Sequence, residues 1–348
     1  MNKAENALLA KAHALYAKRL TNENYSAMLA CRSQAELFAY LKSNTSYGEY
    51  LEKLPGVNLS RARFENVMKQ AQLERIASLC RFEKLIGESL YKYFITKNEI
   101  ETVIYCAQHL DTDVIADLFT VPEFFRKEQT VFGETLQEAR SFSDLAEYLK
   151  DTPYHKVLNS IALSNTQLNL PVLENALYGY LYSTTAETVK KNFKGKQREE
   201  ILNYFRFLSD MIMIEAFYRL NENYSAADNY KANMYVSTVS GFTDKEMQKL
   251  IGSKTGKEVF DIVRSSVYKK YFSGNDASHL EKITREAVVK MCTKNLRFSQ
   301  NPMVCMLCYS TAAENEIKNI THIIEGIKYN LSPDEISEIL VKGEDVCP

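Results

Sequence analysis

The chain has 348 residues, which is more than a typical single domain, so two or three compact units are expected. Its 43 basic and 44 acidic residues leave a net charge of −1. This balance argues against a nucleic-acid-binding protein, which normally carries a basic excess. Gly (12) and Pro (7) are scarce, since average proteins contain roughly 7% and 5% of them. Because sheets and loops use these residues in turns, the composition predicts an all-α protein with long helices and few connections.

The first segment, residues 1–20, is not expected to be a signal peptide. Glu5, Lys11 and Lys18 interrupt its apolar residues, so it lacks the apolar core of a signal peptide. Further along, no stretch approaches the ~20 apolar residues needed to cross a bilayer. Seven cysteines without framework spacing indicate a reduced protein. We therefore expect a soluble, cytoplasmic chain with no direct membrane insertion.

A helical hairpin follows, and it is then repeated. Residues 36–51 read ELFAYLKSNTSYGEYL and residues 144–158 read DLAEYLKDTPYHKVL, so both carry Tyr-Leu-Lys followed by Thr, Tyr and Leu. A fainter third copy, TDKEMQKLIGSKTGKEVFDIV, occupies residues 243–263. The period of about 105 residues exceeds the roughly 20–50 residues of short solenoid repeats. We therefore predict three related helical domains, at residues 1–115, 116–225 and 226–348.

Cap residues are expected at both helices of each hairpin. In a capping box, a hydroxyl residue and an acid three positions later each bond the other's backbone N–H. The first helix is predicted to begin with the pairs Ser33 and Glu36, Ser141 and Asp144, and Thr243 and Glu246. The second helix is predicted to follow an N-cap threonine, at Thr45, Thr152 and Thr255.

Acidic residues recur in the longer helices that follow each hairpin. Each copy has an early acid, at Glu65, Glu174 and Glu281, and a later acid, at Glu99, Asp210 and Glu316. Two carboxylates can perform acid–base chemistry, but one active site does not need three copies. We therefore expect these acids to serve helix capping, interhelical ion pairs or a shared central surface.

Motifs for catalysis or cofactor binding are weak in this sequence. None of the five histidines lies in H-E-x-x-H, and the sequence contains no phosphate-binding glycine loop and no G-x-S-x-G. Cys305 and Cys308 form the single C-x-x-C, among apolar residues of helical pattern. Two buried thiols explain this pair best, and a metal or redox site is the alternative. No cofactor is expected.

The last forty residues carry a recognisable pattern. It comprises a proline before an apolar helix with a tyrosine, then E-x-E-[IV]-x-N-[IL]-x-x-I, a glycine near a lysine, and a short Leu-x-Pro-x-x-Ile helix. The matching positions are Pro302, Tyr309, Glu314, Glu316, Ile317, Asn319, Ile320, Ile323, Gly326, Lys328, Leu331, Pro333 and Ile336. This pattern resembles the C subunit of the bacterial and archaeal V/A-type rotary ATPases, called the d subunit in eukaryotes. The hairpin YLKSNTSYGEYL is similar to that family's L-x-x-T-x-Y-G-x-x-L, and threefold repetition is itself a mark of the family.

The resemblance implies an all-helical, funnel-shaped rotor part with three domains around a pseudo-threefold axis. It would be a non-catalytic central-stalk component that joins the shaft, made of the D and F subunits, to the membrane-embedded proteolipid ring. Ion transport would thereby be coupled to ATP synthesis or hydrolysis, with this component lying peripherally on the cytoplasmic face of the membrane. The candidates for lining or bracing its central cavity are Glu65, Glu99, Glu174, Asp210, Glu281, Glu316 and Asn319.

Two other interpretations remain open from the sequence. One is a free-standing all-helical scaffold that shares this architecture and binds regulatory partners. The other is a metal enzyme that uses Cys305, Cys308 and nearby acids.

Overall fold

The computed structural model shows a helical chain in the residues that it describes. It describes residues 3–52, 61–110, 121–163, 170–223 and 240–343. Every regular element in these ranges is helical, which confirms the all-α prediction. Over the same ranges, no helix has the length and apolar character that crossing a membrane requires.

The chain divides into two compact units. The first consists of residues 1–87, 119–124 and 285–348, and the second of residues 88–118 and 125–284. Two of the boundaries between the units fall inside helices, in α7 (Glu123–Arg126) and in α17 (Leu280–Phe298). The funnel and the domain limits at residues 1–115, 116–225 and 226–348 stay predictions.

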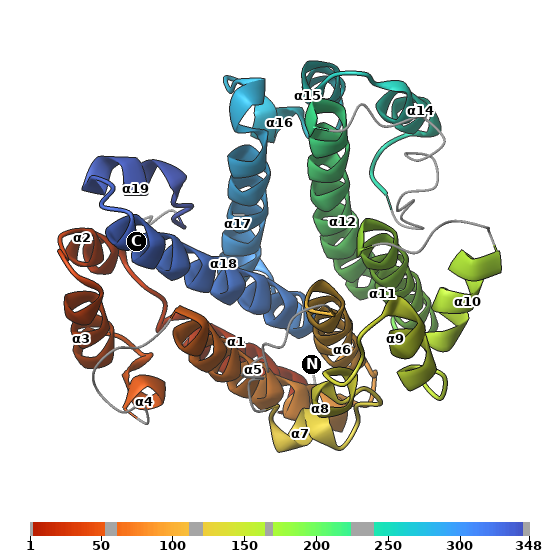
Figure 1. Cartoon of the computed structure of the whole chain (residues 1–348), viewed down its shortest axis with the longest axis horizontal. Helices are drawn as coiled ribbons and strands as arrows, with labels where there is room; N and C mark the ends of the chain where they lie inside the picture. Colours follow the sequence, from red (N-terminus) through yellow and green to blue (C-terminus); the bar gives the residue numbers. More distant parts are fainter. Residues whose placement is uncertain (1–2, 53–60, 111–120, 164–169, 224–239, 344–348) are drawn as a thin grey trace. The chain divides into compact units, whose positions relative to one another are not determined.

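The first unit joins the two ends of the chain. Its other helices are α1 (Lys3–Tyr16), α2 (Asn22–Leu29), α3 (Gln34–Asn44), α4 (Gly48–Leu51), α5 (Arg61–Ile86), α18 (Pro302–Lys328) and α19 (Pro333–Ile339). Helices α1, α5 and α18 pack against one another, so the amino-terminal and carboxyl-terminal helices lie side by side (Figure 1). Helices α2, α3, α4 and α19 cover one part of this bundle.

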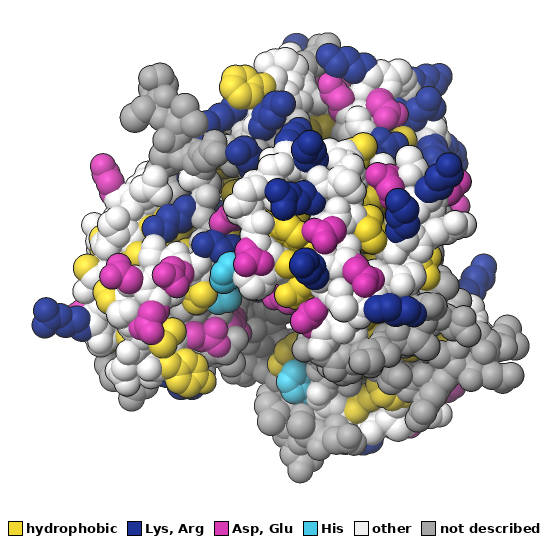
Figure 2. Space-filling model, turned by 90° about the horizontal axis from the view of Figure 1, so that it is seen from above, with side chains coloured by type: hydrophobic (Ala, Val, Ile, Leu, Met, Phe, Trp, Pro, Cys, Tyr) yellow, Lys and Arg dark blue, Asp and Glu magenta, His cyan; other side chains and the backbone are white. Residues whose placement is uncertain are grey.

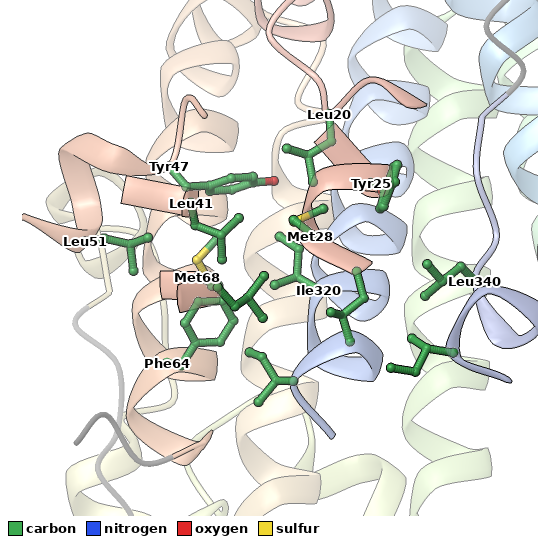
Figure 3. Close-up of a cluster of buried hydrophobic side chains, with 14 residues drawn as sticks. Leu20, Tyr25, Met28, Leu41, Tyr47, Leu51, Phe64, Met68, Ile320 and Leu340 are labelled. Carbon is green, nitrogen blue, oxygen red and sulfur yellow. The ribbon is translucent and has the colours of Figure 1, made fainter. Parts of the chain in front are cut away.

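One apolar cluster holds the first hairpin, which comprises helices α2, α3 and α4, onto α18. Ile320, Ile323 and Ile324 recur at helical spacing on α18 and are all buried. Figure 3 shows Ile320 facing side chains of the hairpin, among them Leu41 and Tyr47. Burying such aliphatic side chains contributes roughly 1.5–3 kcal/mol each, so this cluster fixes the hairpin to the carboxyl-terminal helix.

The second unit contains two further hairpins, each packed on long helices. Its helices are α6 (Lys92–Gln108), α8 (Gly133–Leu136), α9 (Phe142–Tyr148), α10 (His155–Leu163), α11 (Leu170–Asn192), α12 (Gly195–Asn223), α14 (Asp244–Gly252), α15 (Gly256–Ser265), α16 (Lys269–Phe272) and the 3₁₀ turn η1 (Ala277–His279). Helix α11 packs between α6 and α12, and α15 packs on α12. Edge-to-face ring contacts join α6 to α12, with the Tyr93 and Phe205 centroids 5.0 Å apart.

The predicted caps of the first hairpin helices are present. Ser33, Ser141 and Thr243 each accept a hydrogen bond from the N–H of the residue three positions later. The box is complete at Thr243, whose own N–H donates to Glu246. In α3 and α9 the acid instead accepts from the N–H that precedes the cap, which belongs to Arg32 and Arg140 respectively.

The predicted threonine caps of the second helices are correct at one position and wrong at two. Thr255 caps α15 by accepting from the Glu258 N–H at 3.2 Å. Thr45 instead ends α3, because its hydroxyl donates to the Leu41 carbonyl and accepts from the Tyr47 N–H. Its side chain thus closes a turn between two helices.

The same turn occurs in the other two hairpins. Thr152 donates to the Leu149 carbonyl at 2.7 Å and accepts from the Tyr154 N–H at 3.3 Å. In the third hairpin this position is held by Ser266, which accepts from the Tyr268 N–H. The third copy predicted from the sequence therefore lies one helix too early, since α15 rather than α14 is equivalent to α3 and α9.

A glycine lets α19 lie directly on α18. Gly326 is buried, and a Cβ built on it would come within 2.4 Å of Ile336 Cγ1. The Ile336 side chain is only 2% exposed, so it has little room to move away. The short helix, capped by Ser332 and Glu335, is thus held against the backbone of α18.

Replacing Gly326 by alanine is expected to lower the free energy of unfolding by about 1–3 kcal/mol, because the added methyl group overpacks a buried contact. Gly252→Ala is the matched control, since a Cβ placed there would meet nothing within 4 Å and its φ is not positive. Urea unfolding of both variants checks this. Equal stability of the two would contradict the close packing of α19.

Candidate functional site

The later acid of each repeat is buried beside a hairpin. Glu99 on α6, Asp210 on α12 and Glu316 on α18 are exposed by at most 9%. An unpaired buried carboxylate is costly, so each needs hydrogen-bond donors around it. The structure supplies the same kinds of donor three times.

Glu99 anchors the second hairpin. Its Oε1 accepts hydrogen bonds from the backbone N–H groups of Thr130 and Val131, just before α8. Its Oε2 accepts from the hydroxyl of Tyr154 at 2.7 Å. Tyr154 is 1% exposed, and burial together with the nearby Glu99 charge raises its pKa. One carboxylate thus ties α6 to the segment just before α8 and to the turn just before α10.

Asp210 makes the equivalent contacts with the third hairpin. It accepts from the Tyr268 hydroxyl, from the Ser240 hydroxyl at 2.7 Å and from the Gly241 N–H at 2.7 Å. Burial raises the pKa of Asp210, while these three donors lower it. A Cβ on Gly241 would lie 2.4 Å from the Tyr268 hydroxyl oxygen. Glycine therefore lets this backbone segment approach Asp210, whose side chain is shorter than that of a glutamate.

Glu316 completes the set in the first unit. It accepts from the Tyr47 hydroxyl at 2.5 Å and from the Leu20 N–H, just before α2, at 2.7 Å. Burial raises the pKa of Glu316, and these hydrogen bonds partly oppose the shift. Arg75 lies over the ring of Tyr47, with 4.7 Å from its Cζ to the ring centroid.

Asn319 and Asn315, one turn away on α18, hold the segment that follows α19. Asn319 accepts from the Val341 N–H at 3.1 Å and donates to the Val341 carbonyl at 2.7 Å. Asn315 donates to the same carbonyl at 2.7 Å. Asn319 therefore pairs with both backbone groups of Val341, and Asn315 adds a second donor to the carbonyl, so Asn319 has a structural role.

The earlier acids are less buried than the later ones. Glu281 forms an ion pair with Arg219 at 2.6 Å, and both side chains are about half exposed. Glu174 is half-buried, which raises its pKa. Glu65 is partly buried. The predicted role of all seven residues in a central cavity stays a prediction.

Three tyrosines that face the later acids were not predicted from the sequence. Tyr47, Tyr154 and Tyr268 are separated by 107 and 114 residues, and each follows a Thr or Ser by two positions. This Thr/Ser-x-Tyr spacing was the available signal. It is easily overlooked because the third copy has Ser266 instead of threonine.

The cysteine pair lies in the core. Cys305 and Cys308 are fully buried on α18, where Cys308 lies beside Cys292 of α17 and Cys305 Sγ is 3.8 Å from His13 Nε2. Burial raises the pKa of the Cys308 thiol well above its ordinary value. Across the described ranges, no group of three or more His, Cys, Asp or Glu residues is arranged to hold a metal ion.

Tyr154→Phe is expected to lower the free energy of unfolding by about 1.5–3 kcal/mol, because it removes a donor from a buried carboxyl group. Tyr148→Phe is the control, since that hydroxyl contacts Glu138 at the surface and the residue is 38% exposed. The control is expected to change stability by less than ~0.5 kcal/mol. Chemical denaturation measures both, and an equal effect would contradict the anchoring role.

Asp210 makes stability depend on pH in a defined direction. Its pKa is raised in the folded state, so the folded chain holds this proton at a pH where the unfolded chain has released it. The advantage of wild type over Asp210→Asn is therefore expected to be largest near pH 4 and to shrink as pH rises, starting from the ordinary pKa of about 3.9. Urea titrations of both proteins between about pH 4 and pH 7 test this, and a constant or growing difference would contradict it.

The chain is similar to known proteins over most of its length. A family model described as ATP synthase (C/AC39) subunit matches residues 8–339. The C subunit of an A-type ATP synthase from Pyrococcus furiosus is 19% identical over 334 residues, which cover 92% of this chain and 86% of the relative. Because the family model extends over nearly the whole chain, the protein belongs to the ATP synthase (C/AC39) subunit family.

Proposed function

We propose that this chain is a non-catalytic central-stalk component of a V/A-type rotary ATPase. It would connect the D–F shaft to the membrane proteolipid ring, and so couple ion transport to ATP synthesis or hydrolysis. The observation that carries this proposal is the family match over residues 8–339. The name of the Pyrococcus furiosus relative, the C subunit of an A-type ATP synthase, agrees with it.

The buried anchors suit a part that must transmit torque. A coupling between two rotating elements loses work if its own segments bend against each other. Here each hairpin is held at two separated points by one carboxylate, for example at Val131 and Tyr154 by Glu99. Hydrogen bonds to charged groups contribute roughly 1.5–3 kcal/mol each, so these contacts resist hinge motion between a hairpin and its long helix.

The chemistry of the three carboxylates also favours a structural role. Glu99, Asp210 and Glu316 each accept from a tyrosine and from backbone or hydroxyl donors. A general acid or base must reach a substrate proton, whereas these oxygens are engaged inside the protein. The anchors therefore support a protein that acts by its shape and stiffness.

The proposed position in the enzyme is between the shaft and the ring. Three related modules around an axis would form a funnel that seats the shaft end, and the chain would lie peripherally on the cytoplasmic face of the membrane. Glu65, Glu99, Glu174, Asp210, Glu281, Glu316 and Asn319 remain the proposed residues for bracing that recess.

An assembly experiment tests the proposed function. The purified chain is expected to bind a purified D–F complex and, separately, the purified proteolipid ring in detergent, as measured by co-elution in size-exclusion chromatography. An unrelated helical protein of similar size serves as the control and is expected to elute alone. A correctly folded chain, shown by its helical circular dichroism, that binds neither partner would refute the proposal and favour the free-standing scaffold.

A further inference from the structure

A small cavity in the first unit lies beside the Glu316 anchor. Its volume is about 50 Å³, and all the residues that line it belong to the first unit. The charged groups on its wall are three cations, Lys18, Arg19 and Arg75, and one acid, Glu316. On the face of the protein seen in Figure 2, by contrast, acidic side chains lie among the basic ones. The cavity wall therefore carries a local excess of positive charge.

One polar atom on the cavity wall has no partner. The Tyr309 side chain is 4% exposed, and within the described ranges its hydroxyl forms no hydrogen bond. Burial raises the pKa of Tyr309 to about 12, although the nearby Arg75 charge lowers it, so the hydroxyl keeps its proton near neutral pH and can donate a hydrogen bond. A buried hydroxyl without a partner is costly, and a bound water or ion usually explains it.

Arg75 brings a partly buried charge to the same wall. Its Nη2 donates to the Ser46 carbonyl at 2.7 Å and to the Ser46 hydroxyl at 3.2 Å. The guanidinium lies over the rings of Tyr47 and Tyr50. Among the residues that the structure describes, no carboxylate oxygen comes within 4.0 Å of its nitrogens. Because burying a charge is costly unless an opposite charge compensates it, this guanidinium would gain from an anion beside it.

At the other two anchors, the buried tyrosine packs against an aromatic ring. The ring of Tyr180 contacts Tyr154, with 5.6 Å between the ring centroids. The ring of Phe207 contacts Tyr268 in the same edge-to-face manner, with 5.5 Å between the centroids. Because the repeated contact between acid and tyrosine forms there without a guanidinium over the ring, the anchor itself does not require the charge of Arg75. This cation therefore calls for a separate explanation.

We propose that this cavity binds one small inorganic anion, such as chloride or phosphate, between Arg75 and the Tyr309 hydroxyl. A bound water needs roughly 10–15 Å³ of such volume, so a cavity of about 50 Å³ has room for an anion of this size and excludes a nucleotide. Water alone would satisfy the hydroxyl but leave the three positive charges uncompensated, and those charges would repel a metal ion. Glu316 opposes the anion, but its carboxylate already accepts hydrogen bonds from Tyr47 and Leu20.

Anion titrations of the full chain test this inference. Sodium chloride and sodium phosphate are titrated separately into the protein by isothermal titration calorimetry, in a gluconate buffer of constant ionic strength, because gluconate is too large for the cavity. Tyr309→Phe removes the unpartnered hydroxyl, and Arg75→Gln removes the charge. The matched controls on the same two helices are Tyr329→Phe and Arg81→Gln, which change exposed residues outside the cavity. Circular dichroism of every variant checks that it is folded.

We expect wild type to bind one chloride or one phosphate per chain in a saturable manner. Binding should be weaker by about tenfold or more in Tyr309→Phe and Arg75→Gln, because each loses a hydrogen bond to a charged group. The two controls should stay within about twofold of wild type. Absence of saturable binding of either anion, binding that Tyr309→Phe leaves unchanged, or an equal loss in the controls would overturn the inference. Each of these results would leave the proposed function intact, because no rotor partner takes part in the measurement.

Discussion

The structure depends on a simple constraint, which is that a buried carboxylate must be surrounded by donors. Glu99, Asp210 and Glu316 each lie on a long helix where no neighbouring backbone N–H is free to serve them, because helix-interior N–H groups are already bonded. Donors must therefore come from another segment. In all three places they come from a backbone N–H before a short helix and from the hydroxyl of a buried tyrosine. The hydrogen bonds that each carboxylate needs are therefore the same ones that hold the hairpin on its long helix.

This constraint explains why apolar packing alone would be insufficient. The cluster around Ile320 holds the first hairpin against α18, but nonpolar contacts are non-directional and allow small shifts. A hydrogen bond to a carboxylate fixes distance and direction together. The combination gives each hairpin both affinity for its helix and a defined position on it, which is what a stiff coupling needs.

Much of this organisation could be predicted from the sequence. Scarce Gly and Pro indicated helices, and Ser33, Ser141 and Thr243 were recognised as caps because capping depends on residues three positions apart. The later acids were recognised as a repeated set, although their partners were not. Contacts such as that between Glu316 and Leu20 join residues 296 positions apart, and no local pattern encodes them. The third repeat was misaligned because Thr255 resembles Thr152, whereas the true equivalent, Ser266, is chemically similar but a different residue type.

The link between Glu316 and the first hairpin has a consequence for synthesis. Tyr47 leaves the ribosome 269 residues before its carboxylate partner is made. Domains usually fold in order as they emerge, yet the surfaces of this hairpin and of helices α1 and α5 that pack on α18 have no partner until α18 is made. The apolar side chains that face Ile320 and Ile324 in the folded chain therefore lack these partners until α18 is made. A chain truncated before α18 would leave the apolar surface that α18 covers exposed. Cellular quality control could distinguish such unfinished chains from finished ones by this surface.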